Sequence, residues 1–147
     1  FEIEIAELLR KTSIFVDTEQ KDFDYIQKFL RPRTVPRGTA IVKQGQHGDS
    51  MFLIARGIAN VLIDEGGDTS QVATLFAGDI LGEAALLHGA PRNATAEAAT
   101  PCSLYEIKRV DLDRICQEFP VIHERVLEID RSRLEANTET RTGPTDA

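Results

Sequence analysis

The stretch Gly78-Asp79-Ile80-Leu81-Gly82-Glu83-Ala84-Ala85-Leu86-Leu87-His88-Gly89-Ala90-Pro91-Arg92-Asn93-Ala94-Thr95 sets how the rest of this chain is interpreted. Its apolar residues neither alternate as in a strand nor extend far enough for a long helix. They predict one short helical turn, from Ala84 to Leu87, which Gly82-Glu83 introduces and Gly89 closes. Glycine suits the end of a helix because it readily adopts the left-handed conformation found there.

The same stretch carries the features of an anion site. The first N–H groups of a helix have no partner within it, and together with the helix dipole they attract negative charge. Arg92 follows ten residues after Gly82, and its planar guanidinium can pair with two phosphate oxygens at once. Glu83 would repel a phosphate, so we expect it to accept a hydrogen bond from a sugar hydroxyl attached to that phosphate. The pattern therefore predicts a sugar-phosphate ligand.

These residues closely resemble the phosphate-binding cassette of cyclic nucleotide-binding domains. The positions that match are Gly82, Glu83, Ala85, Leu86, Pro91, Arg92, Ala94 and Thr95. Leu81 replaces the usual Phe, and Asn93 stands where the family usually carries Ala, Ser or Thr. The resemblance implies that Glu83 takes the ribose 2′-hydroxyl and Arg92 the exocyclic phosphate oxygens, while the amides of Ala85 and Asn93 help to hold the phosphate. The expected ligand-binding residues are Gly82, Glu83, Ala84, Ala85, Arg92, Asn93 and Ala94.

A β-rich region surrounds the cassette. Short segments rich in β-branched residues recur between glycine turns, at Thr39–Gln44, Met51–Arg56, Ile58–Asp64, Gln71–Phe76, Thr95–Ala98 and Ser103–Ile107. Such spacing is typical of an antiparallel barrel or jelly roll, and Glu65-Gly66-Gly67-Asp68 predicts the tip of a hairpin. Gly38, Gly45, Gly48 and Gly57 match family glycines at which the chain is expected to turn sharply. We therefore expect a mainly β fold, an eight-stranded antiparallel jelly-roll barrel, with helices before and after it.

Helical patterns flank this region. On the N-terminal side we expect a helix over Ile3–Lys11 and a second one that Asp17 or Thr18 caps and Pro32 ends. On the C-terminal side we expect Val110–Glu118, capped by Asp111, then a break at Phe119-Pro120 and a helix over Val121–Ala136. The resemblance implies that this last helix is a hinged lid over the purine base. The side chains that could cover the base are Leu127, Arg131 and Arg133.

Length and composition favour a single domain. A chain of 147 residues with 41% hydrophobic content can bury a core. We expect residues 1–136 to form it, divided into N-terminal helices (1–32), a β-roll (33–108) that contains the cassette (78–95), and hinge and lid helices (109–136), before a disordered tail (137–147). A formal charge of -7 argues against a nucleic-acid partner. No apolar run approaches the ~18 residues of a membrane span, so we expect no membrane contact by this segment.

Three other classes of protein need comparison. A metal enzyme with a similar barrel would need converging His and carboxylate ligands, but His47, His88 and His123 lie far apart in sequence; we therefore expect no metal and no catalysis. The two cysteines have no metal-like spacing either and read as free thiols of a reducing compartment. A transcription factor of the catabolite-activator type would need a DNA-binding segment after the lid. A degenerate domain that serves only protein contact remains the alternative, although it would not require Glu83 or Arg92.

The sequence thus predicts a regulatory module that binds cAMP, or cGMP, and closes its C-terminal helix over the ligand. We expect cAMP to bind as tightly as cGMP or more tightly, with a difference under about ten-fold. The partner is expected to be the remainder of a larger protein, an ion channel or transporter in preference to a kinase. This implies a cytoplasmic location, as the cytosolic domain of a membrane protein.

Overall fold

The computed structural model describes residues 9–10 and 14–141, and these form two four-stranded antiparallel sheets with helices on one side. One sheet has the order β1-β8-β3-β6 and contains β1 (Arg31–Val35), β3 (Ser50–Arg56), β6 (Ile80–Leu81) and β8 (Cys102–Lys108). The other has the order β2-β7-β4-β5 and contains β2 (Ala40–Val42), β4 (Ala59–Glu65), β5 (Asp68–Leu75) and β7 (Thr95–Ala98). The expected mainly β jelly-roll fold is confirmed.

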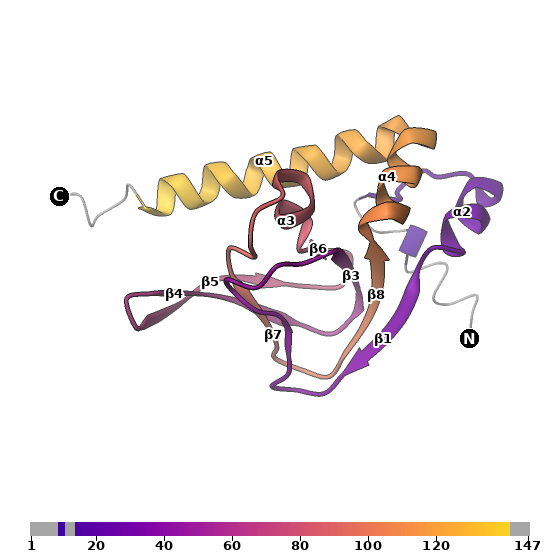
Figure 1. Cartoon of the computed structure of the whole chain (residues 1–147). Helices are drawn as coiled ribbons and strands as arrows, with labels where there is room; N and C mark the ends of the chain where they lie inside the picture. The colour runs from indigo at the N-terminus through magenta and orange to yellow at the C-terminus, as the bar shows by residue number, and fades with distance from the viewer. Residues whose placement is uncertain (1–8, 11–13, 142–147) are drawn as a thin grey trace.

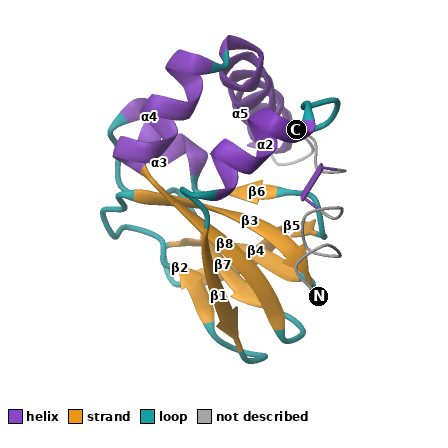
Figure 2. Cartoon of the chain, turned by 90° about the vertical axis from the view of Figure 1, so that its right-hand side faces the viewer, coloured by secondary structure: helices purple, strands orange, loops and turns teal. Residues whose placement is uncertain are grey.

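Four described helices lie together against the first sheet (Figure 2). They are α2 (Gln20–Gln27), α3 (Glu83–His88), α4 (Arg109–Glu118) and α5 (Pro120–Arg141). In Figure 1, α5 runs past the short helix α3, and the two helices contact each other. This contact places the C-terminal helix next to the cassette.

The first sheet is the central layer of the molecule. Leu53 of β3 belongs to a core shared with the helices, which also contains Phe23 and Ile115, whereas its neighbour Ile54 belongs to a second core between the two sheets. Successive side chains of a strand point to opposite faces, so β3 is buried on both sides. The helices therefore pack on a layer that the second sheet supports from behind.

The N-terminal boundaries differ from those expected. The helix that Pro32 was to end stops at Gln27, and Pro32 lies in β1. Because β1 pairs only with β8, at the edge of its sheet, the missing N–H of proline is tolerated there. The N-cap is Glu19, so the expected caps Asp17 and Thr18 were wrong. Most of the helix predicted over Ile3–Lys11 lies outside the described residues.

The C-terminal helices also begin and end elsewhere. Helix α4 starts at Arg109, which puts Asp111 in its first turn and not at its N-cap. The break at Phe119-Pro120 is real, but Pro120 itself begins α5, because the first turn of a helix needs no N–H partner. The backbone of α5 continues past Ala136 to Arg141, so the first part of the expected tail is helical. Residues 142–147 lie outside the described residues.

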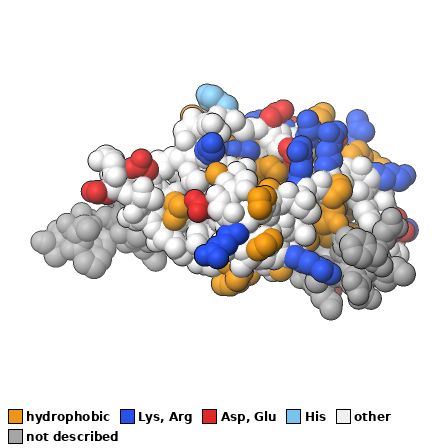
Figure 3. All heavy atoms as spheres, turned by 90° about the horizontal axis from the view of Figure 1, so that it is seen from below, with side chains coloured by type: hydrophobic (Ala, Val, Ile, Leu, Met, Phe, Trp, Pro, Cys, Tyr) orange, Lys and Arg blue, Asp and Glu red, His pale blue; other side chains and the backbone are white. Residues whose placement is uncertain are grey.

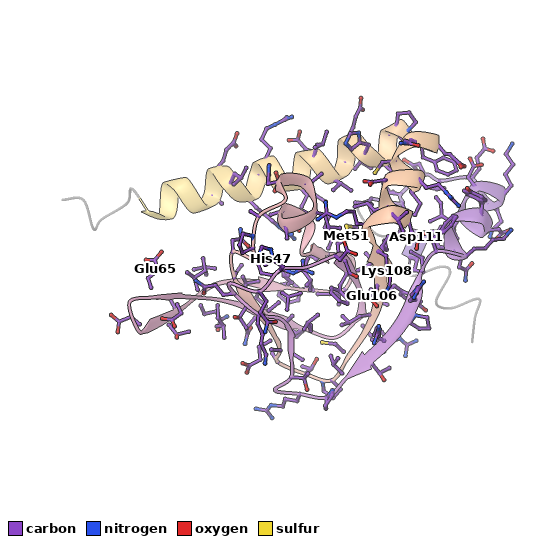
Figure 4. All side chains as sticks on the ribbon, viewed as in Figure 1. His47, Met51, Glu65, Glu106, Lys108 and Asp111 are labelled. Atoms are coloured by element: carbon purple, nitrogen blue, oxygen red, sulfur yellow. The ribbon has the colours of Figure 1, made fainter. Side chains whose placement is uncertain are left out.

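The hairpin predicted at Glu65-Gly66-Gly67-Asp68 is found between β4 and β5. Gly66 and Gly67 both have positive φ and join β4 to β5 in the predicted hairpin, with Glu65 at its tip in Figure 4. On the face seen in Figure 3, apolar side chains show as separate spots and not as one continuous patch. Among the described helices, none has the length and apolar character needed to cross a membrane.

Candidate functional site

The site is built around α3, which the glycines at its two ends delimit. Gly82 before the helix has a φ of +86° and Gly89 after it a φ of +63°, both in the left-handed region. The helix spans Glu83–His88, slightly longer than the predicted turn, and it buries Glu83, Ala85 and Leu86. The sequence pattern therefore placed the helix correctly, and its first residue, Glu83, is a buried carboxylate.

Arg92 returns to the start of this helix. Its side chain is buried, with Nη1 donating to the carbonyl of Gly82 at 2.9 Å and Nη2 donating to the carbonyl of Ser50 at 2.6 Å. Burial lowers the pKa of Arg92, and the negative charge of Glu83 raises it in part. Both partners are uncharged carbonyls, so they orient the guanidinium without cancelling its positive charge.

The loop before β3 holds the backbone of Arg92. The Arg92 N–H donates to the carbonyl of Gln46, and the Gly45 N–H donates to the carbonyl of Arg92, both at 2.8 Å. Gly48 in the same loop was expected to serve a sharp turn, but positive φ is found at Gly45 and not at Gly48. A methyl group on Gly48 would instead overlap the guanidinium of Arg92. Any larger residue at this position would therefore displace the Arg92 side chain, which fills the space of a side chain at Gly48.

Two polar contacts join α3 to α5. Arg133 donates from Nη1 to Oε1 of Glu83 at 2.7 Å and from Nη2 to the carbonyl of Ile80 at 2.6 Å. One turn earlier in α5, the buried Asp130 lies 2.8 Å from Nε2 of His88. Arg133 was a candidate to cover the base, but its guanidinium is bound to the cassette carboxylate. His88 is exposed, yet it connects the two helices.

A cavity of about 180 Å³ lies between the cassette, the second sheet and α5. All the expected ligand-binding residues line it: Gly82, Glu83, Ala84, Ala85, Arg92, Asn93 and Ala94. The wall opposite is apolar and includes Val42, Val61, Val72 and Leu75 of the second sheet. The cavity therefore combines a buried cation and a buried carboxylate with an apolar surface, as a nucleotide requires.

Of the three residues expected from the C-terminal helix, only Arg133 is among those that line the cavity. Arg133 lines the cavity together with Asp130, Leu134 and Ala136, whereas Leu127 and Arg131 do not. Arg131 points elsewhere and pairs with Glu128 at 2.9 Å. Sequence reasoning missed Asp130 and Leu134, although a signal existed. Positions 126, 130, 133 and 134 follow the helical spacing i, i+4, i+7 and i+8 and so share one face of α5, on which Val126 and Asp130 are buried.

Metal chemistry finds no support in the part of the chain that the structure describes. There, no group of three or more His, Cys, Asp and Glu side chains could hold an ion. Cys102 and Cys116 are free thiols, and burial together with Asp113 raises the pKa of Cys116 to about 11. A thiol with so high a pKa is a poor nucleophile near neutral pH.

Comparisons with known sequences point to one family. The family model described as "Cyclic nucleotide-binding domain" matches residues 32–119, more than half of the chain. A cyclic nucleotide-gated potassium channel of Rhizobium etli is 39% identical over 101 residues, which cover 69% of this chain and 27% of the channel. The matched part is thus about a quarter of that relative's length.

Solved structures share the fold. The catabolite activator protein of Thermus thermophilus superposes with a TM-score of 0.80 at 26% identity, covering 88% of this chain and 62% of that protein. The regulatory domain of Toxoplasma gondii PKA, solved with cAMP, gives a TM-score of 0.70 at 25% identity, covering 78% of this chain and 44% of that one. The two sheets, the cassette and the flanking helices therefore follow a known arrangement.

Proposed function

Because this chain belongs to the cyclic nucleotide-binding domain family, we propose that it senses a cyclic nucleotide, cAMP in the first place, in the cavity beside α3. The family is a regulatory and not a catalytic one, found in cyclic nucleotide-gated channels and in regulatory subunits of cAMP-dependent protein kinase. The observation that carries the proposal is Arg92, a buried arginine that lines a cavity without a carboxylate bound directly to it.

Arg92 is the proposed phosphate ligand. Its two carbonyl partners occupy one hydrogen of each terminal nitrogen, and a guanidinium has five N–H donors. The remaining donors can pair with the phosphodiester oxygens in a low-dielectric setting, where charge-assisted hydrogen bonds are strong. A cyclic phosphodiester carries a single negative charge, which Arg92 can neutralise because the other cavity arginine, Arg133, is paired with Glu83.

Glu83 and the apolar wall account for the nucleoside. A buried carboxylate accepts hydrogen bonds and cannot donate them when ionised, so the ribose 2′-hydroxyl is a suitable partner for Glu83. The valine and leucine side chains opposite provide the apolar contact that a purine base needs. Asn93 lies at the rim, where it can reach the base or the sugar.

The signal would leave the site through α5. This helix contacts α3 at two polar pairs and packs against α4, so a ligand that binds one arrangement of these helices better shifts their equilibrium. We assign the receiving partner to the remainder of a larger protein, an ion channel or transporter on the cytoplasmic side of a membrane. The matched channel supports this assignment.

The alternative is a domain that keeps the fold for protein contact and binds no nucleotide. Such a domain would gain nothing from a buried, cavity-lining Arg92, whose burial is unfavourable without a compensating anion. The specific geometry of Arg92 and Glu83 therefore favours the sensing function.

Isothermal titration calorimetry with cAMP and cGMP tests the proposal. Arg92→Ala should weaken cAMP binding by at least about ten-fold, since truncating one partner of a buried charged contact costs roughly 2–5 kcal/mol. Arg37→Ala, which removes an exposed arginine of the β1–β2 connection, is the matched control and should bind as the wild type does. Equal affinities of wild type and Arg92→Ala would refute the proposed phosphate site, and no binding by the folded wild type would favour the protein-contact alternative.

A further inference from the structure

Glu83 is a carboxylate that needs a partner. Only 3% of the residue is exposed, and an ionised carboxylate taken out of water is costly unless hydrogen bonds and an opposite charge compensate it. Of the two arginines that line the cavity, Arg92 belongs to the cassette, but it donates its described hydrogen bonds to carbonyls and acts on Glu83 through charge alone. The direct partner comes from outside the cassette.

That partner is Arg133 of α5, and its geometry is specific. One terminal nitrogen of Arg133 donates to Oε1 of Glu83 at 2.7 Å, and the other donates to the carbonyl of Ile80 at 2.6 Å. Ile80 lies in β6, the strand that leads into α3. A planar fork held at both ends fixes the position of the carboxylate relative to the strand, which a point charge such as lysine cannot do equally well.

We propose that Arg133 is a positioning residue for sugar recognition: it holds one oxygen of Glu83 so that the other accepts the hydrogen bond of the ribose 2′-hydroxyl. The inference rests on the proposed function and adds to it a role for α5. The helix supplies part of the sugar site and does not serve only as a cover for the base. Occupation of the sugar site and docking of α5 are then coupled, because both use the same carboxylate.

A neighbour in the same helix provides a control. Arg131 carries the same charge two residues earlier, but it pairs within α5 with Glu128, and both of these side chains are mostly exposed. Removing Arg131 changes the net charge of α5 as much as removing Arg133 does. A difference between the two variants is therefore due to the contact with Glu83 and not to charge on the helix.

The experiment measures the affinities of cAMP and 2′-deoxy-cAMP by calorimetry for wild type, Arg133→Ala and Arg131→Ala. The wild type should prefer cAMP, and Arg133→Ala should reduce that preference by roughly ten-fold, the usual effect of one hydrogen bond to a charged group. Arg131→Ala should leave the preference unchanged. In a Glu83→Ala background, Arg133→Ala should have no further effect on the preference.

The ratio between the two ligands separates positioning from a structural role. A general loosening of α5, or loss of a contact between Arg133 and the base, would weaken both ligands by the same factor, and that result would overturn the inference. Tighter cAMP binding by Arg133→Ala would overturn it too, as would a wild type without preference for the 2′-hydroxyl. In each case retained sensitivity of cAMP binding to Arg92→Ala would leave the proposed function standing, whereas a wild type that binds neither ligand would refute the function itself.

Discussion

The Arg92 side chain has room beside the loop only because residue 48 is a glycine. A methyl group at position 48 would overlap the guanidinium, and one at Gly82 would approach its Nη1 atom closely. Gly82 also has a positive φ, whereas Gly48 does not, so only at Gly48 is the steric effect separate from backbone strain. The sequence pattern indicated that Gly48 is structurally important, but it did not reveal that the Arg92 side chain occupies the space next to it.

Gly48→Ala should therefore move Arg92 and weaken cAMP binding by about ten-fold or more, as expected for a displaced buried charge contact. Gly38→Ala offers the opposite case. A methyl group there meets nothing, but the φ of +87° strains any side chain, so this variant should lower the melting temperature and keep the affinity. Calorimetry and thermal unfolding of both variants check the pair of expectations, and unchanged binding by Gly48→Ala would show that Arg92 does not need its observed position.

Asn93 is the residue that bears on the choice of base. Its side chain is exposed, lines the cavity and makes no hydrogen bond within the part of the chain described. An asparagine side chain in a loop can bond back to the local backbone or contact a ligand. The structure leaves the side-chain amide of Asn93 available to the ligand. Its carbonyl can accept from the guanine amino group.

We expect Asn93→Ala to reduce the affinity for cGMP more than that for cAMP, by a few-fold or about 1 kcal/mol for one neutral hydrogen bond. The wild type should still bind cAMP as tightly as cGMP or more tightly. Competition of both nucleotides against a fluorescent cAMP analogue measures the two ratios. A hundred-fold preference of the wild type for cGMP would contradict this expectation. It would show that the site recognises guanine more strongly than one neutral hydrogen bond from Asn93 allows.

At the scale of elements, two of the differences between sequence and structure concern prolines. Proline was expected to end a helix, but Pro32 lies in an edge strand and Pro120 begins α5. Both positions avoid the need for a backbone N–H, so a proline alone does not distinguish a helix end from an edge strand or a first turn. The cassette helix and the Gly66-Gly67 hairpin were placed well because local conformation alone determines them.

Glu106 joins three neighbouring strands. It accepts hydrogen bonds from Ser50 of β3 at 2.6 Å and from Arg33 of β1 at 2.7 Å, and its place on β8 is labelled in Figure 4. Burial raises the pKa of Glu106, but the hydrogen bonds of Ser50 and Arg33 more than offset this, so that the pKa lies below its ordinary value of 4.5. Because the carbonyl of Ser50 also holds Arg92, this strand contact supports the site.

A lowered pKa in the folded state gives a definite sign for acid stability. The stabilising effect of Glu106 is fully present above its unfolded-state pKa and is lost as the pH falls through the lower folded-state pKa. Glu106→Gln should therefore be less stable than wild type at pH 7, and its stability should fall less steeply between about pH 5 and pH 3. Urea unfolding across this range measures both effects. Glu124→Gln on the exposed face of α5 should follow the wild-type curve, and a parallel curve for Glu106→Gln would contradict the assignment.

The whole molecule assembles the site from three distant parts of the chain. The loop at 45–50, the cassette and α5 each supply a partner to Arg92 or Glu83. Sequence reasoning found the cassette because its residues are contiguous and their spacing is specific. It could not assign Arg133 to Glu83, because that contact depends on the length and path of α4 and α5, which residue patterns determine only approximately.

Binding at a site shared by sheet and helices should stabilise the whole fold. A ligand that binds only the folded state adds roughly 2.7 kcal/mol at a hundred-fold excess over its dissociation constant, which corresponds to about 5–10 °C in a domain of this size. We expect saturating cAMP to raise the melting temperature by that amount in differential scanning calorimetry. AMP has an open phosphate with a second negative charge and lacks the fixed phosphodiester geometry, so it should raise the melting temperature little. Arg92→Ala should lose the response to cAMP, and Arg37→Ala should keep it. If AMP and cAMP stabilised the wild type equally, the cavity would recognise adenine and not the cyclic phosphodiester, and the role assigned to Arg92 would be wrong.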